Sequence, residues 1–352
     1  MFRYLLICLL TLIGYTTTAQ NAAFTQVNLN SYDGLTGAPE CPTDIVKLGN
    51  DWFALVPEPS AQDAGRLYKS DNGGLTWIKQ DVIFPAASTG DDKMLHLQTV
   101  GNNLVVFSLS VFTNANNKLE QHILGHVSTN AGQTFDLVFE KVYIAFNGDN
   151  YVEDSGLDEA NGHLFFYYKV DGVDTEQVFF SPDQGFSWQE STEVPWFCND
   201  IRQIAGDNGK YFIISSNLMC MSLDPSFTDA ENNVWTPNGG GQMIHCSVDG
   251  DIVRVCTDKG QVYRWNFVPY SFTETQLPFH PDAAMADNGF WYFNHGGHFY
   301  RAPWHAPTNL TDAGIVPMIP TSYQNVFHYR CRFETAGGRL FFLNDTPLES
   351  LD

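Results

Sequence analysis

The chain has 352 residues with 40 acidic and 18 basic side chains, which gives a formal net charge of −22 at pH 7. Hydrophobic residues make up 43% and aromatic residues 14%, enough apolar surface to build a core and to exclude a mainly disordered chain. The acidic excess argues against a nucleic-acid-binding protein and against docking on anionic lipid, because both need clustered Lys and Arg.

The first 19 residues have the pattern of a secretory signal peptide. Arg3 supplies a positive charge, an apolar run follows at 5–13, and small residues stand before a cut between Ala19 and Gln20. The alternative, a membrane anchor, needs a longer apolar run, and no later segment is long and apolar enough to cross a bilayer. We therefore expect 1–19 to be removed, 20–352 to form the mature domain, and the protein to be secreted or periplasmic.

An eight-residue motif occurs three times between residues 70 and 188. The copies are SDNGGLTW at 70–77, STNAGQTF at 128–135 and SPDQGFSW at 181–188, and 222–226 resembles a fourth copy without the glycine and the aromatic residue. Serine and Asp or Asn oxygens can accept hydrogen bonds from the N–H groups of a turn, and glycine takes the position with positive φ. The motif therefore predicts a hairpin turn whose last residue, an aromatic one, begins the next strand and packs into the core.

A second pattern, a tight turn followed by an apolar strand, extends over the whole mature chain. The strands are rich in β-branched and aromatic residues and are bounded by Gly, Asn and Asp, as buried strands should be. They are expected at 52–56, 104–107, 164–168, 211–214, 252–255, 290–293 and 340–343. The intervals between these units have the length of a four-stranded blade.

These units predict an all-β fold, a single β-propeller with seven four-stranded antiparallel blades around a central channel. Six blades are the alternative, if one unit belongs to an insertion. The last unit has too few residues after it to finish a blade, so we expect a strand at 24–29 to complete it and remove the exposed edges. Helices are not expected after the signal peptide, because no segment has a sustained apolar stripe of helical period.

Six cysteines remain after the signal peptide is removed, and an even number in an exported protein permits disulfides. They are Cys41, Cys198, Cys220, Cys246, Cys256 and Cys331. Among the possible pairings we favour Cys41 with Cys331, because both precede the innermost strands that flank the seam of the ring. The alternative is that all six are small buried thiols.

With its three octapeptides, the mature chain resembles the secreted Asp-box β-propellers, a superfamily that includes sialidases and sortilin ectodomains. The resemblance covers the mature chain at the level of the fold, and only the octapeptides are specific to the family. In that family the motif, also called the bacterial neuraminidase repeat, lies between the third and fourth strands of a blade, away from the usual active site. This implies a structural role for Ser70, Asn72, Gly74, Thr76, Trp77, Ser128, Asn130, Gly132, Thr134, Phe135, Ser181, Asp183, Gly185, Ser187 and Trp188.

The resemblance does not extend to the arginines with which sialidases bind their substrate. A sialic-acid carboxylate calls for converging guanidinium groups, and the aromatic-Arg-Ile-Pro motif of sialidases is absent. Arg202, Arg330 and Arg332 lie near expected starts of innermost strands and are candidate binding residues. The alternative is that they are ordinary surface or blade-bridging arginines.

An aspartate stands near the start of five expected innermost strands, at Asp44, Asp92, Asp154, Asp200 and Asp282. In a ring these residues would converge on the mouth of the channel, where like charges raise one another's pKa and could serve acid–base catalysis of glycoside hydrolysis. We take Asp44, Asp92, Asp200 and Asp282 as candidate catalytic residues and Asp154 as a candidate binding residue. The same carboxylates could instead bind Ca²⁺ or a cationic ligand, or simply occupy polar loop ends.

The remaining chemistry is sparse. His295 and His298 have no third ligand at a suitable spacing, so no metal site is predicted, and Ca²⁺ is the one cofactor considered. We expect a monomeric, non-enzymatic binding or assembly module with a protein or glycan ligand on one face. The alternative is a sialidase-like glycoside hydrolase that uses the carboxylates at the channel mouth.

Overall fold

A computed structural model defines the fold. The described residues are 44–57, 65–74, 76–82, 95–113, 119–144, 152–170, 176–191, 194–195, 198, 200–230, 234–267, 270–296, 298–315, 331–336 and 339–344. The expected signal peptide at 1–19 and the expected strand at 24–29 lie outside these residues.

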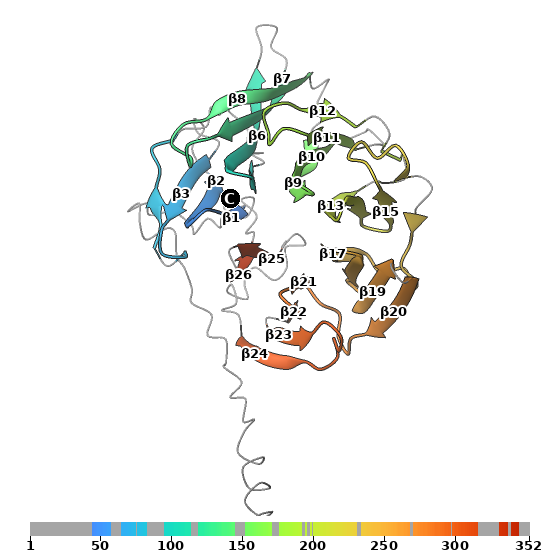
Figure 1. Ribbon diagram of the computed structural model, residues 1–352. Helices are drawn as coiled ribbons and strands as arrows, with labels where there is room; N and C mark the ends of the chain where they lie inside the picture. Colours follow the sequence, from blue (N-terminus) through green and yellow to red (C-terminus); the bar gives the residue numbers. More distant parts are fainter. Residues whose placement is uncertain are drawn as a thin grey trace, which may run out of the picture.

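The chain is a single β-propeller made of antiparallel four-stranded blades arranged in a ring (Figure 1). Blades 1 to 3 contain β1 (Asp44–Leu48), β2 (Asp51–Pro57), β3 (Gly65–Ser70) and β4 (Ile78–Lys79); β5 (Leu95–Val100), β6 (Asn103–Thr113), β7 (Leu119–Ser128) and β8 (Asp136–Ile144); and β9 (Val152–Ala160), β10 (His163–Val170), β11 (Gln177–Ser181) and β12 (Gln189–Glu190). Blades 4 to 6 contain β13 (Ile201–Asp207), β14 (Lys210–Ser215), β15 (Met219–Ser222) and β16 (Val234–Trp235); β17 (Met243–Asp249), β18 (Ile252–Thr257), β19 (Gln261–Phe267) and β20 (Tyr270–Gln276); and β21 (Ala283–Asp287), β22 (Phe290–His295), β23 (His298–Pro303) and β24 (Thr311–Ile315).

The ring is closed by a further pair of strands, β25 (Cys331–Ala336) and β26 (Arg339–Asn344). β25 contacts both β1 and β21, the innermost strands of blades 1 and 6 (Figure 1). The described residues therefore form six four-stranded blades, the lower of the two expected numbers, and a two-stranded sheet in the remaining position. No α-helix occurs in the described part of the chain, as expected.

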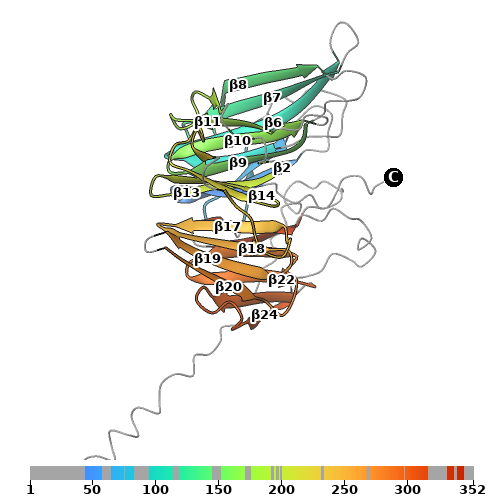
Figure 2. The ribbon, with the colours of Figure 1, turned by 90° about the vertical axis from the view of Figure 1, so that its right-hand side faces the viewer.

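The two sides of the ring differ in what they carry. Each blade runs from its innermost strand outward in a simple up-and-down order, and the strands cross the thickness of the ring (Figure 2). The innermost strands therefore all begin on one side, which we call the strand-start face. The turns that join first to second strands and third to fourth strands lie on the opposite side, which we call the turn face.

The hydrophobic core is a set of apolar layers between neighbouring blades. β14 illustrates the pattern, because successive side chains on a strand point to opposite faces of the sheet. Ile213 packs into the layer shared with blade 3, whereas Phe212 and Ile214 pack into the layer shared with blade 5. Burial on both sides explains the nearly continuous apolar runs in the sequence.

The Asn-Gly pairs form the hairpin turns expected from the sequence. At 161–162 and 208–209 both residues have positive φ, between 53° and 79°. Two-residue turns of this kind match the right-handed twist of the strands that they join. These turns place their polar side chains on the turn face.

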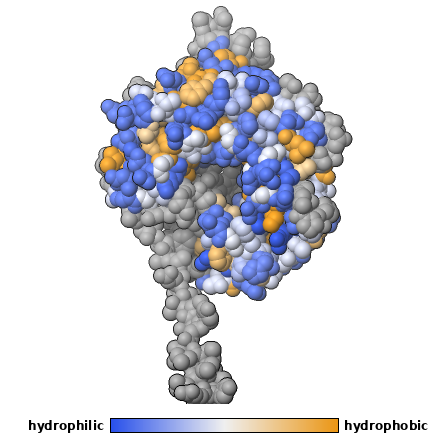
Figure 3. Space-filling model, viewed as in Figure 1, coloured by the Kyte–Doolittle hydropathy of each residue, from blue (hydrophilic) through white to orange (hydrophobic). Residues whose placement is uncertain are grey.

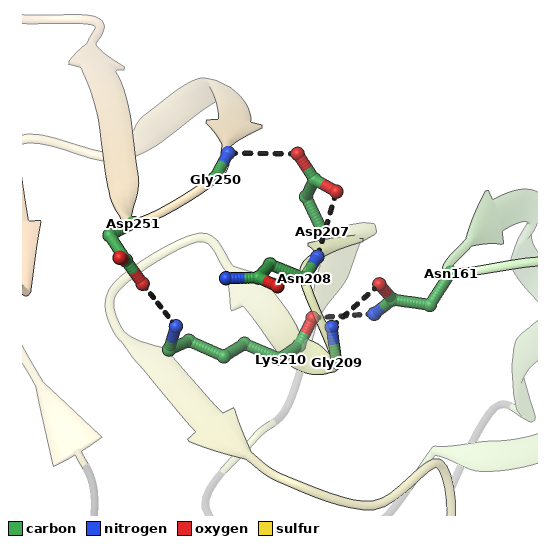
Figure 4. A network of polar contacts seen from close by, with 7 residues as sticks. All are labelled: Asn161, Asp207, Asn208, Gly209, Lys210, Gly250 and Asp251. Carbon is green, nitrogen blue, oxygen red and sulfur yellow. Dashed lines mark hydrogen bonds and ion pairs between the residues drawn. The ribbon is translucent and has the colours of Figure 1, made fainter.

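Turns of neighbouring blades are hydrogen-bonded to each other on this face (Figure 4). The Asn161 side chain of blade 3 accepts from the N–H of Gly209 at 3.0 Å and donates to the carbonyl of Lys210 at 2.8 Å, both in blade 4. Asp207 of blade 4 then accepts from the N–H of Gly250 in blade 5 at 2.8 Å. Polar side chains thus fasten the turns of blades 3, 4 and 5 together.

The three octapeptides form hydrogen-bonded turns between the third and fourth strands of blades 1 to 3. In the first, Ser70 Oγ accepts from the N–H of Gly74 and Asn72 Oδ1 accepts from the N–H of Thr76, each at 2.9 Å. The Trp77 ring is fully buried and its Nε1–H donates to the Gly74 carbonyl at 2.9 Å. Equivalent serine and Asn or Asp hydrogen bonds form in the second and third copies.

The degenerate fourth copy also forms a turn, between β15 and β16. Asp224 accepts from the Ser226 N–H at 2.9 Å and from the Thr228 hydroxyl at 2.6 Å. The sequence pattern predicted no aromatic residue here, but Phe227 is buried among the rings between blades 3 and 4. The aromatic residue is therefore present two positions earlier than the motif places it.

The favoured disulfide between Cys41 and Cys331 cannot be assessed in the described residues. Cys41 lies outside them, and only the backbone of Cys331 is described. Cys198, Cys220, Cys246 and Cys256 are buried, and the structure shows no S–S bond at any of them. No disulfide is therefore observed among the described cysteines.

Candidate binding face

The aspartates that the sequence places at the channel mouth are spread over the ring. Asp44 begins β1 in blade 1, Asp200 directly precedes β13 in blade 4, and Asp282 directly precedes β21 in blade 6. All three stand where innermost strands begin, so they share the strand-start face. They do not form one carboxylate pair, because blades 1, 4 and 6 are not neighbours.

Asp44 links two blades. Its Oδ2 accepts from the backbone N–H of Leu97 on β5 at 2.9 Å, and His96 Nδ1 lies 3.7 Å from the same oxygen. His96 Nε2 is in turn 2.8 Å from Ser155 Oγ on β9, so polar side chains connect the innermost strands of blades 1, 2 and 3. The adjoining pocket has a volume of about 10 Å³, room for one water molecule and not for a sugar.

Asp200 is paired with one of the arginines singled out in the sequence. Arg202 Nη2 donates to Asp200 Oδ2 at 2.8 Å, and each side chain is about one-third exposed, 36% and 35% respectively. Asp200 also has a positive φ of 61°, and its carbonyl accepts from the Ser216 N–H at 3.0 Å. The pair is a solvent-accessible feature of the connection that leads into blade 4.

Asp282 holds the turn that follows β22. Its Oδ2 accepts from the N–H of Gly296 at 2.8 Å, while its own N–H donates to the carbonyl of Asn294 at 2.8 Å. The residue is exposed. Asp282 therefore combines a structural hydrogen bond with access to solvent.

The other candidates are described less fully. Asp92 and Arg330 lie outside the described residues. Asp154 is opposite Lys169 in the register of β9 and β10, and Arg332 is opposite Leu343 in that of β25 and β26, with only their backbones described.

The sequence did not reveal a repeated hydrogen bond between the innermost strands. At four blade interfaces, a side chain on one innermost strand accepts from a backbone N–H of the innermost strand of the next blade. The pairs are Asp44 with Leu97, Asp158 with Ile204, Gln203 with Cys246 and His245 with Ala286, at 2.9, 2.7, 3.1 and 3.0 Å. Because the accepting side chain can be Asp, Gln or His, no shared residue type in the sequence could have revealed this pattern.

His245 accepts through Nε2, which requires that nitrogen to be unprotonated. Burial lowers the pKa of His245 to about 4. The ring is therefore neutral at physiological pH, as an acceptor must be.

The acidic character of the strand-start face comes from several blades. Carboxylates on the described segments of this face include Asp44, Asp81, Asp200, Asp258 and Asp282, and the basic residues Arg202 and Lys259 lie among them. Within the described residues, no group of three or more His, Cys, Asp or Glu side chains is placed to hold a metal ion.

The face seen in Figure 3 is the turn face, opposite the strand-start face, and it is largely hydrophilic around the middle of the ring. No helix among the described residues is long and apolar enough to cross a membrane. On the strand-start face, the polar residues come from segments of separate blades, which suits a ligand that extends across the opening better than one enclosed in a deep pocket.

No protein-family model matches the sequence, and no curated protein matches it. Solved structures do match. One, titled "YCF48 bound to D1 peptide", aligns with a TM-score of 0.50 and 11% identity over 89% of this chain and 94% of that one. Another, the computationally designed Ika8 protein, aligns with a TM-score of 0.48 and 11% identity over 88% and 95% of the two chains.

These similarities concern the fold. At 11% identity, the alignment with YCF48 supports a β-propeller and carries no residue-level assignment.

Proposed function

We propose that this protein is a binding module that holds a basic segment of a partner protein across the strand-start face of the ring. The observation that carries the proposal is the placement of Asp200 and Asp282 on separate blades of one face, where Asp200 is half-buried and Asp282 is exposed. Carboxylates distributed around an opening can each meet a different Lys or Arg of an extended peptide. The propeller of the solved YCF48 structure, which has a peptide bound, offers a precedent at the level of the fold.

The net charge of the chain supports a basic partner. A formal charge of −22 attracts cationic segments over a long range and raises their rate of association, most strongly at low salt.

Export is part of the proposal. The charged start, the apolar run and the small residues before position 20 support cleavage of 1–19 and a secreted or periplasmic location. N-terminal sequencing of the exported protein should begin at Gln20, and retention of residues 1–19 would contradict this part of the proposal.

Glycoside hydrolysis is the alternative activity. It needs two carboxylates within reach of one sugar, whereas Asp44 and Asp282 lie on separate blades and each holds a backbone N–H. Release of sugar from a panel of sialylated and neutral glycans, abolished by Asp44→Asn, would replace the binding proposal with a hydrolase.

Fluorescence anisotropy with three labelled peptides of equal length, one rich in Lys and Arg, one neutral and one rich in Glu, tests the binding proposal. We expect the basic peptide alone to bind, with a Kd that rises with salt concentration. Asp200→Asn and Asp282→Asn should each raise the Kd about threefold to tenfold, the effect expected for one charged contact.

Asp71→Asn is the matched control, because it removes one exposed charge from the turn face. It should leave the Kd nearly unchanged. Equal binding of all three peptides, no binding of the basic one, or an equal loss in Asp71→Asn would contradict the proposal.

A further inference from the structure

Two cysteines that sequence spacing did not pair lie side by side in the core. Cys198 is in the connection from β12 to β13, and Cys220 is on β15 opposite Ile213 of β14. Their sulfur atoms are 2.6 Å apart although the residues are 22 positions apart in the chain. Unbonded heavy atoms prefer about 3.5–4.0 Å, whereas a disulfide bond is about 2.05 Å long.

We propose that Cys198 and Cys220 form a disulfide bond in the mature protein. The pair joins the connection that enters blade 4 to the third strand of the same blade. Both side chains are almost fully buried, at 1% and 0% exposure, in the apolar layer between blades 3 and 4. The bond would fix the segment that carries Asp200 and Arg202 on the strand-start face.

The other two described cysteines show that burial alone does not explain the close approach. Cys246 lies opposite Val255, and Cys256 lies opposite His245, so the two occupy neighbouring positions on β17 and β18. Their side chains nevertheless enter different layers, Cys246 toward blade 4 and Cys256 toward blade 6. They cannot bridge across their own sheet, and they are matched buried controls.

The bond forms by thiol–disulfide exchange with an oxidant that is itself a disulfide, such as oxidised glutathione or an exported dithiol oxidase. One thiolate attacks a sulfur of the oxidant, breaks the oxidant's S–S bond, displaces the other sulfur as a thiolate and forms a mixed disulfide. The second thiolate then attacks the cysteine sulfur of the mixed disulfide and displaces the remaining oxidant sulfur as a thiolate, so the oxidant ends fully reduced. Two protons leave the cysteines, and two electrons pass to the oxidant.

Oxidation should occur during folding and not afterwards. The adjacent Cys220 thiol, burial and the nearby negative charge of Glu176 raise the pKa of Cys198, so the folded thiol is a poor nucleophile. Once enclosed, the bond is protected from reductant in the same way. This behaviour suits an oxidising compartment outside the cytosol.

The test is to refold the full chain from denaturant in a buffer of reduced and oxidised glutathione. Free thiols are then blocked with N-ethylmaleimide under denaturing conditions, and the disulfides are mapped by proteolysis and mass spectrometry. We expect a peptide pair that joins Cys198 to Cys220, with Cys246 and Cys256 alkylated. Alkylation of both Cys198 and Cys220, or a bridge from either to another cysteine, would overturn the proposal.

Substitutions give a second readout. Without reductant, Cys198→Ser and Cys220→Ser should each lower the Tm by roughly 4 °C, the entropic value for a loop of this length in a chain of this size. Refolding with dithiothreitol should lower the Tm of the wild type similarly and should not lower that of either variant further. Cys246→Ser should keep the dependence on reductant, and equal responses in all variants would count against the bond.

Discussion

Blades 1 to 3 and blades 4 and 6 all pack an aromatic side chain beside the turn between their third and fourth strands, but with different residues. In the first three blades, the turn from the third to the fourth strand carries the octapeptide, and in blades 1 and 3 an indole N–H donates to a backbone carbonyl of that turn. In blade 6 the corresponding turn has no octapeptide, yet Trp304 Nε1 donates to the Phe290 carbonyl at 2.7 Å. Its ring stacks against Arg254 at 3.5 Å.

The comparison shows that an aromatic side chain beside this turn, which we call the anchor, also occurs in blades without the octapeptide. Phe227 in blade 4 and Trp304 in blade 6 pack beside turns that the motif does not describe. What the octapeptide adds is a closed set of hydrogen bonds within the turn.

The two tryptophan anchors, Trp77 and Trp304, should contribute differently to the free energy of unfolding. Trp77 is 1% exposed, whereas Trp304 is only partly buried. We expect Trp77→Ala to lower the free energy of unfolding by about 4 kcal/mol and Trp304→Ala by roughly half as much, because a fully buried ring loses more contacts and leaves a larger cavity. Urea denaturation measures both, and equal losses would show that the burial of the ring does not set the strength of the anchor.

The glycine of the octapeptide turn should be required both because its φ is positive and because a Cβ would clash with the neighbouring blade. Gly185 has a φ of +97°, and a Cβ there would lie 2.7 Å from Val105 Cγ2 of blade 2. Gly162 has a φ of +79° with nothing within 4 Å of a Cβ. Gly185→Ala should cost about 2 kcal/mol more than Gly162→Ala in the same denaturation experiment, and a difference near zero would contradict close packing between the blades.

The hydrogen bond from Ala286 to His245, which joins blades 5 and 6, should make stability depend on pH. The pKa of His245 is lowered in the folded state, so the unfolded chain takes up its proton first as the pH falls. The stabilising effect is fully present above pH 6.5 and is lost between pH 6.5 and about 4. A fully buried ring would lose about 3 kcal/mol over this range, and partial exposure of His245 reduces our expectation to roughly half.

His245→Gln keeps an acceptor of the kind that Gln203 provides in blade 4. It should remove this part of the pH dependence, measured as the urea midpoint from pH 7 to pH 4. An unchanged dependence would mean that His245 is protonated in the folded protein.

The smallest effect is expected within the octapeptides themselves. Burial raises the pKa of Asp183, but the hydrogen bonds from Ser187 and Ser181 outweigh it and hold the pKa below its usual value. Its stabilising effect is therefore present above the usual pKa and is lost as the pH falls through the lowered one.

Asp183→Asn reproduces the residue that the first two copies have at this position. Stability at pH 7 should be unchanged, and the loss below pH 4 should become smaller. A clear loss at pH 7 would show that the third turn depends on the charge.

The fold was readable from the sequence because its signals are local. A turn such as 208–209 followed by an apolar strand is contained in a few residues, and repetition of that unit predicts a ring. The ties between blades were not readable, since Asp158 or Gln203 acquires its role only when a distant strand is placed beside it. For the same reason, the sequence placed the aspartates on one face but did not show which of them lie close together. The spacing of the cysteines likewise did not predict the contact of Cys198 with Cys220.

The side-chain-to-backbone hydrogen bonds that join the innermost strands, and those that join the turns of blades 3, 4 and 5, run in one direction around the ring. An earlier blade supplies the side chain, as Asp44, Asp158 and Asn161 do, and the following blade supplies a backbone group that nearly every residue type possesses. A blade therefore places few demands on the composition of its successor. The sequence of one blade can therefore change without a compensating change in the next blade. Later blades could lose the octapeptide during evolution in this way while the propeller remained closed.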